Sequence, residues 1–174
     1  LVGPAGVLEA RRPDEVPGVL AAAEQATARG LWAAGFVAYE AAPGLDPALR
    51  VREPAAGDPL ADLPLAWFAM FEGREETVLP EPSGDAPAAA AWEPATTRRD
   101  YDAAIARLRQ LIAAGETYQV NYTLRLRASI EGDARGLYRD LCYAQRGAYG
   151  AYIDAGAVRV LSASPELFFR IDGE

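Results

Sequence analysis

The residues best suited to chemistry stand in a stretch where polar and apolar side chains alternate. Over residues 118–128 the apolar side chains take every second position, and Gln119, Asn121 and Thr123 fall between them. This alternation predicts a strand with one apolar and one polar face. The three uncharged groups would stand about 7 Å apart, a row suited to the hydroxyl and carboxylate groups of a small ligand. A solvated sheet face, continued by two arginines, is the alternative interpretation.

A second candidate is the carboxyl group of Glu166, which follows Ser164 and Pro165 and precedes three apolar residues. Proline fixes its own φ and favours extended geometry in the residue before it, so it would hold this glutamate at the entrance of a strand predicted over 166–171. A carboxyl group among apolar side chains keeps its proton more readily and can act as a general acid. The alternative is a glutamate on a solvated edge strand.

Small and aromatic residues form a third candidate over 147–152. Glycine lets the backbone approach a ligand closely, as at Gly150, and the ring of Tyr149 could stack on that ligand. Packing of these aromatic rings across a sheet is the alternative.

The residue types that are missing restrict the chemistry. The chain has 174 residues and no His, and all 17 of its basic residues are Arg. A His base, a His metal ligand or a Lys nucleophile must therefore come from outside it. The one Cys, Cys142, excludes an internal disulfide and a Cys-rich metal cluster, and core packing is its expected role.

Charge and hydropathy also restrict the partners. The 25 acidic residues give a net charge of −8, which argues against nucleic acid or an anionic membrane as a partner. No run approaches the ~18 apolar residues of a membrane span. A single Cys fits a reducing compartment, so we expect a cytoplasmic protein.

The pattern of elements predicts an α+β fold with antiparallel sheets covered by helices. Apolar spacing and end signals predict helices over 14–28, 97–114 and 133–145, ended in the first two cases by Gly30 and Gly115. Short apolar runs predict strands over 32–39 and 63–72, with a hairpin of 149–154 and 158–162 around Ala155-Gly156. Residues 42–60 are expected to be mostly loop.

The same pattern predicts a division into parts. We expect an amino-terminal sheet and helix region (1–78), a Pro- and Ala-rich surface crossing (79–96), and the start of a second domain (97–174). There is no initiator Met, and the turn signal Asp172-Gly173 has no returning strand after it. We therefore expect the chain to be a piece of a longer product, truncated at its carboxyl end.

Three segments taken together resemble motifs of the chorismate-utilising enzymes, most closely the large components of aminodeoxychorismate synthases. They are Gly115-Glu116-Thr117-Tyr118-Gln119-Val120-Asn121-Tyr122-Thr123, Tyr149-Gly150-Ala151-Tyr152 and Ser162-Ala163-Ser164-Pro165-Glu166-Leu167-Phe168-Phe169. The resemblance spans nearly the whole chain and implies an incomplete portion of the chorismate-binding enzyme fold.

The resemblance implies a reaction. Chorismate loses its ring hydroxyl and gains an amino group from ammonia with the help of Mg²⁺, on the way to p-aminobenzoate and folate. A partner glutamine amidotransferase supplies the ammonia. In the family, a nucleophilic Lys and the Mg²⁺-binding glutamates belong to a later part of the enzyme. We therefore expect the chain to need that remaining carboxyl-terminal part and to be inactive alone.

Residue by residue, the resemblance implies that Glu166 is the catalytic acid at the departing hydroxyl. Gln119, Asn121, Thr123, Tyr149 and Gly150 match segments that bind the substrate, and no metal ligand is carried over. Gln119 stands where relatives that add water carry a Lys base, and an amide cannot activate water.

Two other functions remain open from the sequence. The large subunit of anthranilate synthase is the nearest alternative, although Asn121 favours the aminodeoxychorismate branch. A non-catalytic binding or scaffold module is the alternative of a different class.

Overall fold

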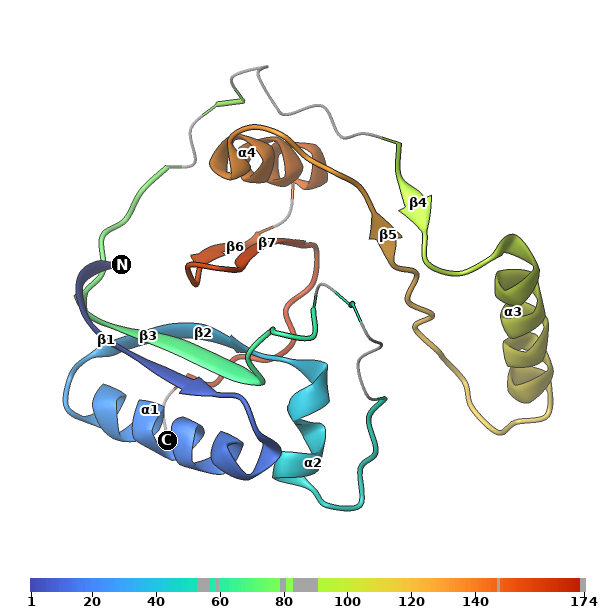
Figure 1. Ribbon diagram of the computed structural model, residues 1–174, viewed down its shortest axis with the longest axis horizontal. Coiled ribbons are helices and arrows are strands. Elements are labelled where there is room, and N and C mark those ends of the chain that lie inside the picture. The colour runs from blue at the N-terminus through green and yellow to red at the C-terminus, as the bar shows by residue number, and fades with distance from the viewer. Residues whose placement is uncertain (53–56, 59, 79–80, 83–90, 147, 173–174) are drawn as a thin grey trace. The chain divides into compact units, whose positions relative to one another are not determined.

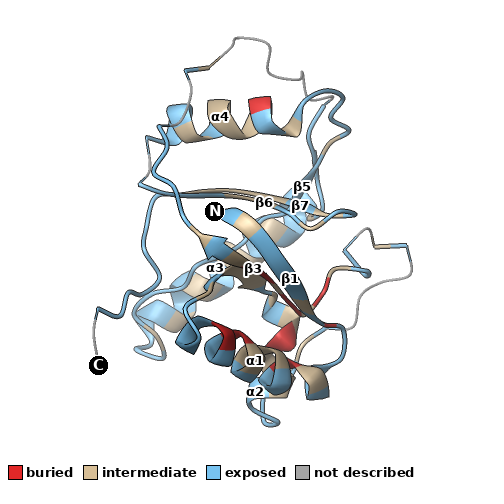
Figure 2. Cartoon of the chain, turned by 90° about the vertical axis from the view of Figure 1, so that its left-hand side faces the viewer, coloured by how far each residue is buried: buried red, intermediate tan, exposed pale blue. Residues whose placement is uncertain are grey.

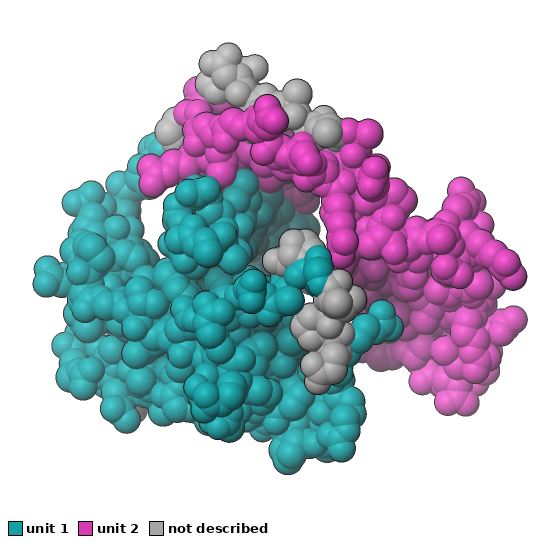
Figure 3. All heavy atoms as spheres, in the orientation of Figure 1, with its two compact units in different colours: residues 1–80, 147–174 teal, residues 81–146 magenta. Residues whose placement is uncertain are grey.

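The computed structural model describes residues 1–52, 57–58, 60–78, 81–82, 91–146 and 148–172 (Figure 1). The chain divides into two compact units, one formed by Leu1–Pro80 with Gly147–Glu174 and the other by Glu81–Arg146 (Figure 3). Both combine helices with antiparallel strands, which confirms the predicted fold class. Much of the predicted surface crossing over 79–96 lies outside the described residues.

The first unit contains a three-stranded antiparallel sheet in the order β1-β3-β2. Its strands are β1 (Val2–Ala10), β2 (Trp32–Val37) and β3 (Ala66–Gly73). The last two confirm predicted strands, whereas β1 was not predicted. Glycine and proline hide its pattern, and its register shifts between Pro4 and Gly6. An edge strand tolerates Pro4 because its outer backbone groups need no ladder partner.

Helix α1 (Val16–Ala28) packs against this sheet and confirms the predicted first helix. Val16 is fully buried with alanines of β1 and β3, and Ala23 and Ala26 pack around Met70. Figure 2 shows buried residues gathered on α1 and the strands beside it. Burial of these apolar side chains is the main stabilising term of the unit.

Strands β2 and β3 approach so closely that Gly35 has no room for a side chain. A Cβ at this position would lie 1.9 Å from the carbonyl oxygen of Trp67 and 2.8 Å from the Cα of Phe68. Gly35 pairs with Phe68 in the ladder. The missing side chain therefore permits the spacing of the two strands.

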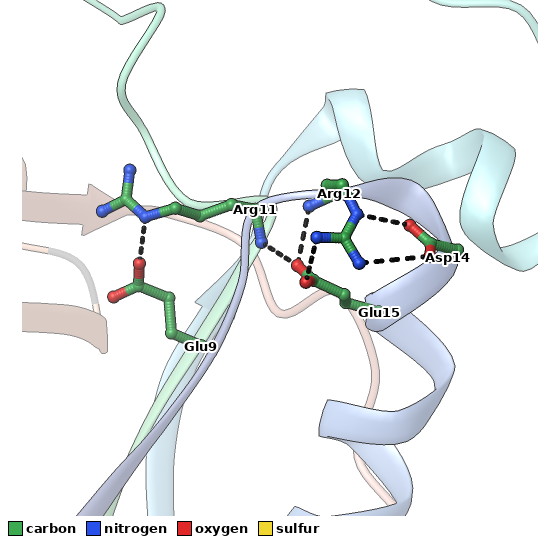
Figure 4. A network of polar contacts seen from close by, with 5 residues as sticks. All are labelled: Glu9, Arg11, Arg12, Asp14 and Glu15. Carbon is green, nitrogen blue, oxygen red and sulfur yellow. Dashed lines mark hydrogen bonds and ion pairs between the residues drawn. The ribbon is translucent and has the colours of Figure 1, made fainter.

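A charged network fixes the turn from β1 into α1 (Figure 4). The Glu15 carboxylate accepts the backbone N–H groups of Arg11 at 2.8 Å and of Arg12 at 2.9 Å. Those two hydrogen bonds lower the pKa of Glu15 below its ordinary value of 4.5. Arg12 also pairs with Asp14 at 3.2 Å, and Arg11 pairs with Glu9. The network closes the 3₁₀ turn η1 (Pro13–Glu15) that leads into the helix.

The rest of the first unit holds short helices and the predicted hairpin. The 3₁₀ turn η2 (Tyr39–Ala41) and the single helical turn α2 (Ala42–Leu45) follow β2. The hairpin consists of β6 (Tyr149–Asp154) and β7 (Arg159–Ser164). Its turn is closed by the Ala155 N–H donating to the Val158 carbonyl at 2.9 Å, as the Ala155-Gly156 signal predicted.

The second unit contains the two other predicted helices, α3 (Arg98–Ala113) and α4 (Ala134–Gln145). Thr97 caps α3, since its hydroxyl accepts the Asp100 N–H at 3.1 Å. Gly115, in the left-handed region at φ +78°, ends α3 with the Glu116 N–H donating to the Leu111 carbonyl at 3.0 Å. This Schellman closure is why glycine is favoured there.

Helix α4 begins at Asp133, whose carboxylate accepts the Arg135 and Gly136 N–H groups. The lone Cys142 is half-buried on this helix. Burial, together with a hydrogen bond to Cys142, raises the pKa of Tyr138 to about 12. The cysteine thus lies at the rim of the unit, more exposed than the core position that we expected.

The second unit has little interior of its own. Among its described residues Gly136 alone is buried. Its two strands, β4 (Glu93–Pro94) and β5 (Leu126–Arg127), form a short antiparallel ladder. None of the described helices is both long and apolar enough to cross a membrane.

Candidate functional site

The predicted strand over 118–128 forms only at β5, so most of that prediction is wrong. The ladder pairs Glu93 with Arg127 and Pro94 with Leu126, and one further hydrogen bond joins Ala95 to the Arg125 carbonyl at 2.9 Å. The opposing chain then enters α3, whose cap is Thr97. Residues 118–124 therefore have no neighbouring strand among the described residues, and alternation without a partner does not make a strand.

The side chains of this segment lie at the surface. Gln119, Asn121 and Thr123 are exposed, as predicted for a polar row that meets a ligand or solvent. The apolar positions between them are exposed too, with Tyr118 93% exposed. The segment contacts α3 through the rings of Tyr101 and Tyr122, which meet edge to face with centroids 5.6 Å apart.

The hairpin brings the other three predicted residues to one end. Tyr149 pairs with Ser164, and Gly150 pairs with Ala163. Glu166 follows Ser164 by two residues, so its carboxyl group starts from the strand end that carries Tyr149. The Ser164 hydroxyl donates to the Glu166 carbonyl at 2.9 Å and turns the chain after β7.

The chain after the hairpin differs from the prediction. Residues 166–171 form no strand, and Glu166 is exposed. Phe168 is 95% exposed and contacts the neighbouring Phe169 edge to face at 5.0 Å between centroids. The apolar surroundings expected for the Glu166 carboxyl are therefore absent from the described residues, because no neighbouring strand packs against this segment.

The predicted site residues thus fall into two groups in separate units. Tyr149, Gly150 and Glu166 belong to the unit built on the three-stranded sheet, and Gln119, Asn121 and Thr123 belong to the unit of α3 and α4. The hairpin register brings the first group together, whereas the second group lies on a segment that forms neither helix nor strand. Their common use in one site stays a prediction.

Two cavities are formed by other residues. One of about 370 Å³ lies beside the β4–β5 ladder and is lined by residues including Glu93 and Arg127. The other, of about 250 Å³, lies between β1 and α1 and is lined by Gly6, Ala26 and Met70 among others. Neither cavity was predicted from the sequence, and the wall of the second on β1 belongs to the strand that Gly and Pro obscured. Neither cavity includes a predicted site residue.

Across the described ranges, no three His, Cys, Asp or Glu side chains converge on one point. Mg²⁺ prefers oxygen ligands and in enzymes is held by carboxylates together with substrate phosphates and water. The described residues therefore do not fit a complete Mg²⁺ site, and the prediction that its ligands lie elsewhere stays a prediction.

The family of chorismate binding enzymes matches the chain over residues 3–174. The chain belongs to this family.

The curated relatives that match the chain bear the names of two kinds of enzyme. An aminodeoxychorismate synthase of Streptomyces griseus is 35% identical over 113 residues, which are 62% of this chain and 16% of that protein. Aminodeoxychorismate synthase component 1 of Salmonella typhimurium is 32% identical over 82 residues, 47% of this chain and 18% of that protein.

Anthranilate synthase component 1 of Thermus thermophilus is 38% identical over 77 residues, 44% of this chain and 17% of that protein. The matched part of this chain thus spans less than a fifth of each of these relatives. No solved structure matches the chain significantly.

Proposed function

We propose that the chain is the amino-terminal part of an aminodeoxychorismate synthase large component. The observation that carries this proposal is the family match over residues 3–174. Gln119 and Asn121, which lie within the motif of residues 115–123, add to that support. Most of the matching relatives bear the aminodeoxychorismate synthase name. Gln119 supports the addition of ammonia, because its amide cannot act as the base that activates water.

In the proposed reaction, the carbon–oxygen bond from the chorismate ring to its hydroxyl group breaks. A carbon–nitrogen bond forms between the ring and ammonia. The hydroxyl takes a proton from Glu166 and leaves as water, while the incoming ammonia gives up a proton that restores the acid. Glutamine, hydrolysed by a partner amidotransferase, would supply the ammonia. The product, 4-amino-4-deoxychorismate, would lead to p-aminobenzoate and folate.

The binding roles follow from the two groups of residues. Tyr149 and Gly150, at the same hairpin end as Glu166, would contact the ring and its carboxylate through an aromatic face and close backbone. Gln119, Asn121 and Thr123 would supply hydrogen bonds to the substrate. Mg²⁺ belongs to the proposal as a cofactor that other parts of the enzyme hold, and the cytoplasm is the location that a lone Cys favours.

The test uses a chimera in which this chain replaces the matched region of the Streptomyces griseus relative. We expect the chimera to convert chorismate and ammonia to 4-amino-4-deoxychorismate, identified by mass spectrometry, and the 174-residue chain alone to convert none. Glu166→Ala should lower kcat by about 10²–10⁴-fold, the usual contribution of a general acid, with a much smaller change in KM.

Glu76→Ala is the matched control, because Glu76 is an exposed glutamate of the same unit that lies outside the motifs. Its kcat should equal that of the unmodified chimera. Unchanged turnover in Glu166→Ala would remove this residue from the mechanism, and product formation by the isolated chain would refute the requirement for the remaining part.

Anthranilate synthase is the second candidate, favoured by the 38% identity to the Thermus thermophilus protein. The same assay separates the two functions, because anthranilate is aromatic and fluorescent whereas 4-amino-4-deoxychorismate is not aromatic. Fluorescent product from chorismate and ammonia would favour this second function.

A further inference from the structure

No side chain in the described part of the molecule holds the Glu166 carboxyl group in place. The residue is exposed, and its carboxyl group makes no hydrogen bond or ion pair with another described residue. A general acid must nevertheless lie within hydrogen-bond reach of the group that it protonates. Within this chain, the position of the carboxyl group is therefore set by the backbone of Glu166.

A hydrogen bond from Ser164 restrains that backbone. The Ser164 hydroxyl donates to the Glu166 carbonyl at 2.9 Å. In the described ranges, residues 165–172 take part in no hydrogen bond between backbone groups. Pro165 has no N–H group with which to continue the β6–β7 ladder. The serine hydroxyl therefore supplies the restraint that the ladder gives to residues earlier in the strand.

Ser164 is itself well anchored. It is the last residue of β7, is half-buried and pairs with Tyr149 of β6. The residue before a proline favours extended geometry, which is also the geometry of a strand. The hydrogen bond thus carries the order of the hairpin beyond its end, and it restrains Glu166 relative to Tyr149 and to the neighbouring Gly150.

We propose that Ser164 is a positioning residue that orients the Glu166 carboxyl group toward the ring hydroxyl of chorismate through its hydrogen bond to the Glu166 carbonyl. The inference rests on the proposed function, because it takes Glu166 as the acid of that reaction. Ser164 would touch neither the substrate nor the carboxyl group. Without its hydroxyl, the Glu166 backbone would turn among several orientations, of which few place the acid correctly.

This role has a kinetic signature. A correctly oriented acid contributes in the transition state, so a smaller oriented fraction lowers kcat and leaves the KM for chorismate nearly unchanged. One neutral hydrogen bond changes an orientation equilibrium by about 3–10-fold. We therefore expect a loss of kcat by that factor when the Ser164 hydroxyl is removed.

Two substitutions at Ser164 separate its hydroxyl from its packing. Threonine and valine are both β-branched and suit a strand, but only threonine has a hydroxyl group. In the chimera with the Streptomyces griseus relative, Ser164→Val should lower kcat by about 3–10-fold. Ser164→Thr should retain kcat within about twofold, because its hydroxyl is the same donor.

Ser162→Ala is the matched control. Ser162 is half-buried on the same strand and lies two residues before Ser164, so it shares that residue's face of the hairpin. Its loss should leave kcat unchanged. In a Glu166→Ala background, Ser164→Val should lower kcat no further, because a residue that acts through Glu166 has no effect once the acid is absent.

A second measurement on the 174-residue chain needs no turnover. Nuclear magnetic resonance relaxation gives the order parameter of the Glu166 N–H group, which reports motion of the backbone on the picosecond to nanosecond timescale. We expect it to fall below about 0.6, the flexible range, in Ser164→Val and to stay above that value in the unmodified chain and in Ser164→Thr.

The outcomes separate this inference from the proposed function. Equal kcat in the Ser164→Thr and Ser164→Val chimeras, whether both are active or both are impaired, would overturn the positioning role. Full turnover by Glu166→Ala would refute the proposed acid and the inference with it. If the unmodified chimera makes no product, the proposed function fails. Equal order parameters in the threonine and valine variants would then overturn the positioning of Glu166 by Ser164, and different ones would uphold it.

Discussion

The central strand β3 and the segment 118–124 both have apolar side chains that predict a strand, but their structures differ. β3 lies between β1 and β2 and under α1, and Trp67 and Met70 on it are buried. In the segment, Tyr118 is 93% exposed and no described strand lies alongside. A suitable side-chain pattern therefore produces a strand only where the chain also supplies a neighbouring strand for it to pair with.

The largest expected effect concerns the neighbours of β3. Gly35→Ala should lower the free energy of unfolding by more than about 3 kcal/mol, at or beyond the upper range for overpacking, because its Cβ would meet backbone atoms of β3 and not a flexible side chain. Chemical denaturation followed by tryptophan fluorescence measures it, since Trp67 lies on β3.

Gly18→Ala is the control for that substitution. Gly18 lies within α1, and a Cβ there would meet nothing within 4 Å. The change should stabilise the protein by about 0.5–1 kcal/mol through helix propensity. Equal effects of the two substitutions would show that the close approach of β2 and β3 does not depend on Gly35.

A smaller effect is expected in the second unit. Thr97→Ala removes the hydroxyl that caps α3 and should cost about 1 kcal/mol of helix stability. Circular dichroism at 222 nm during thermal unfolding measures it. Thr96→Ala is the neighbouring control, since Thr97 is the residue that caps the helix. The chain that follows β4 enters α3 and does not pair with residues 118–124. Loss of the α3 cap should therefore leave the hydrogen-exchange protection of residues 118–124 unchanged.

The smallest effect concerns the turn between β1 and α1. The folded-state pKa of Glu15 is lowered by the backbone N–H groups of Arg11 and Arg12. A lowered pKa gives a stabilising contribution that is present above the ordinary value of 4.5 and is lost as the pH falls through the folded-state pKa.

Glu15→Gln should therefore lower stability slightly at pH 7 and make it less sensitive to acid below about pH 4.5. Denaturation midpoints at pH 7 and pH 3 for the two proteins measure the difference. A substitution that left the acid dependence unchanged would show that the carboxylate does not stabilise the turn.

The sequence allowed most local elements to be predicted, for reasons visible in single residues. Thr97 and Gly115 mark the ends of α3 by local hydrogen bonds that depend on few other parts of the chain. The hairpin around Ala155-Gly156 is local too. Strand β1 was missed because its bulge and Pro4 break the alternation, and an edge strand does not need a regular pattern.

The predicted strands over 118–128 and 166–171 fail for a physical reason of a different kind. Strand pairing is a long-range property, and the side-chain pattern carries no information on whether a partner is present. The candidate site shows the same division. The hairpin register places Tyr149 at the strand end that leads to Glu166, whereas the polar row around Asn121 depends on a strand that the described chain does not form.

Native-state hydrogen exchange of the 174-residue chain tests most directly the central claim, that neighbours decide which apolar segments are ordered. We expect the amides of β3 to exchange only through global unfolding, and those of residues 118–124 to exchange within about tenfold of the rate of an unstructured peptide. Protection of 118–124 equal to that of β3, at low protein concentration, would contradict the claim.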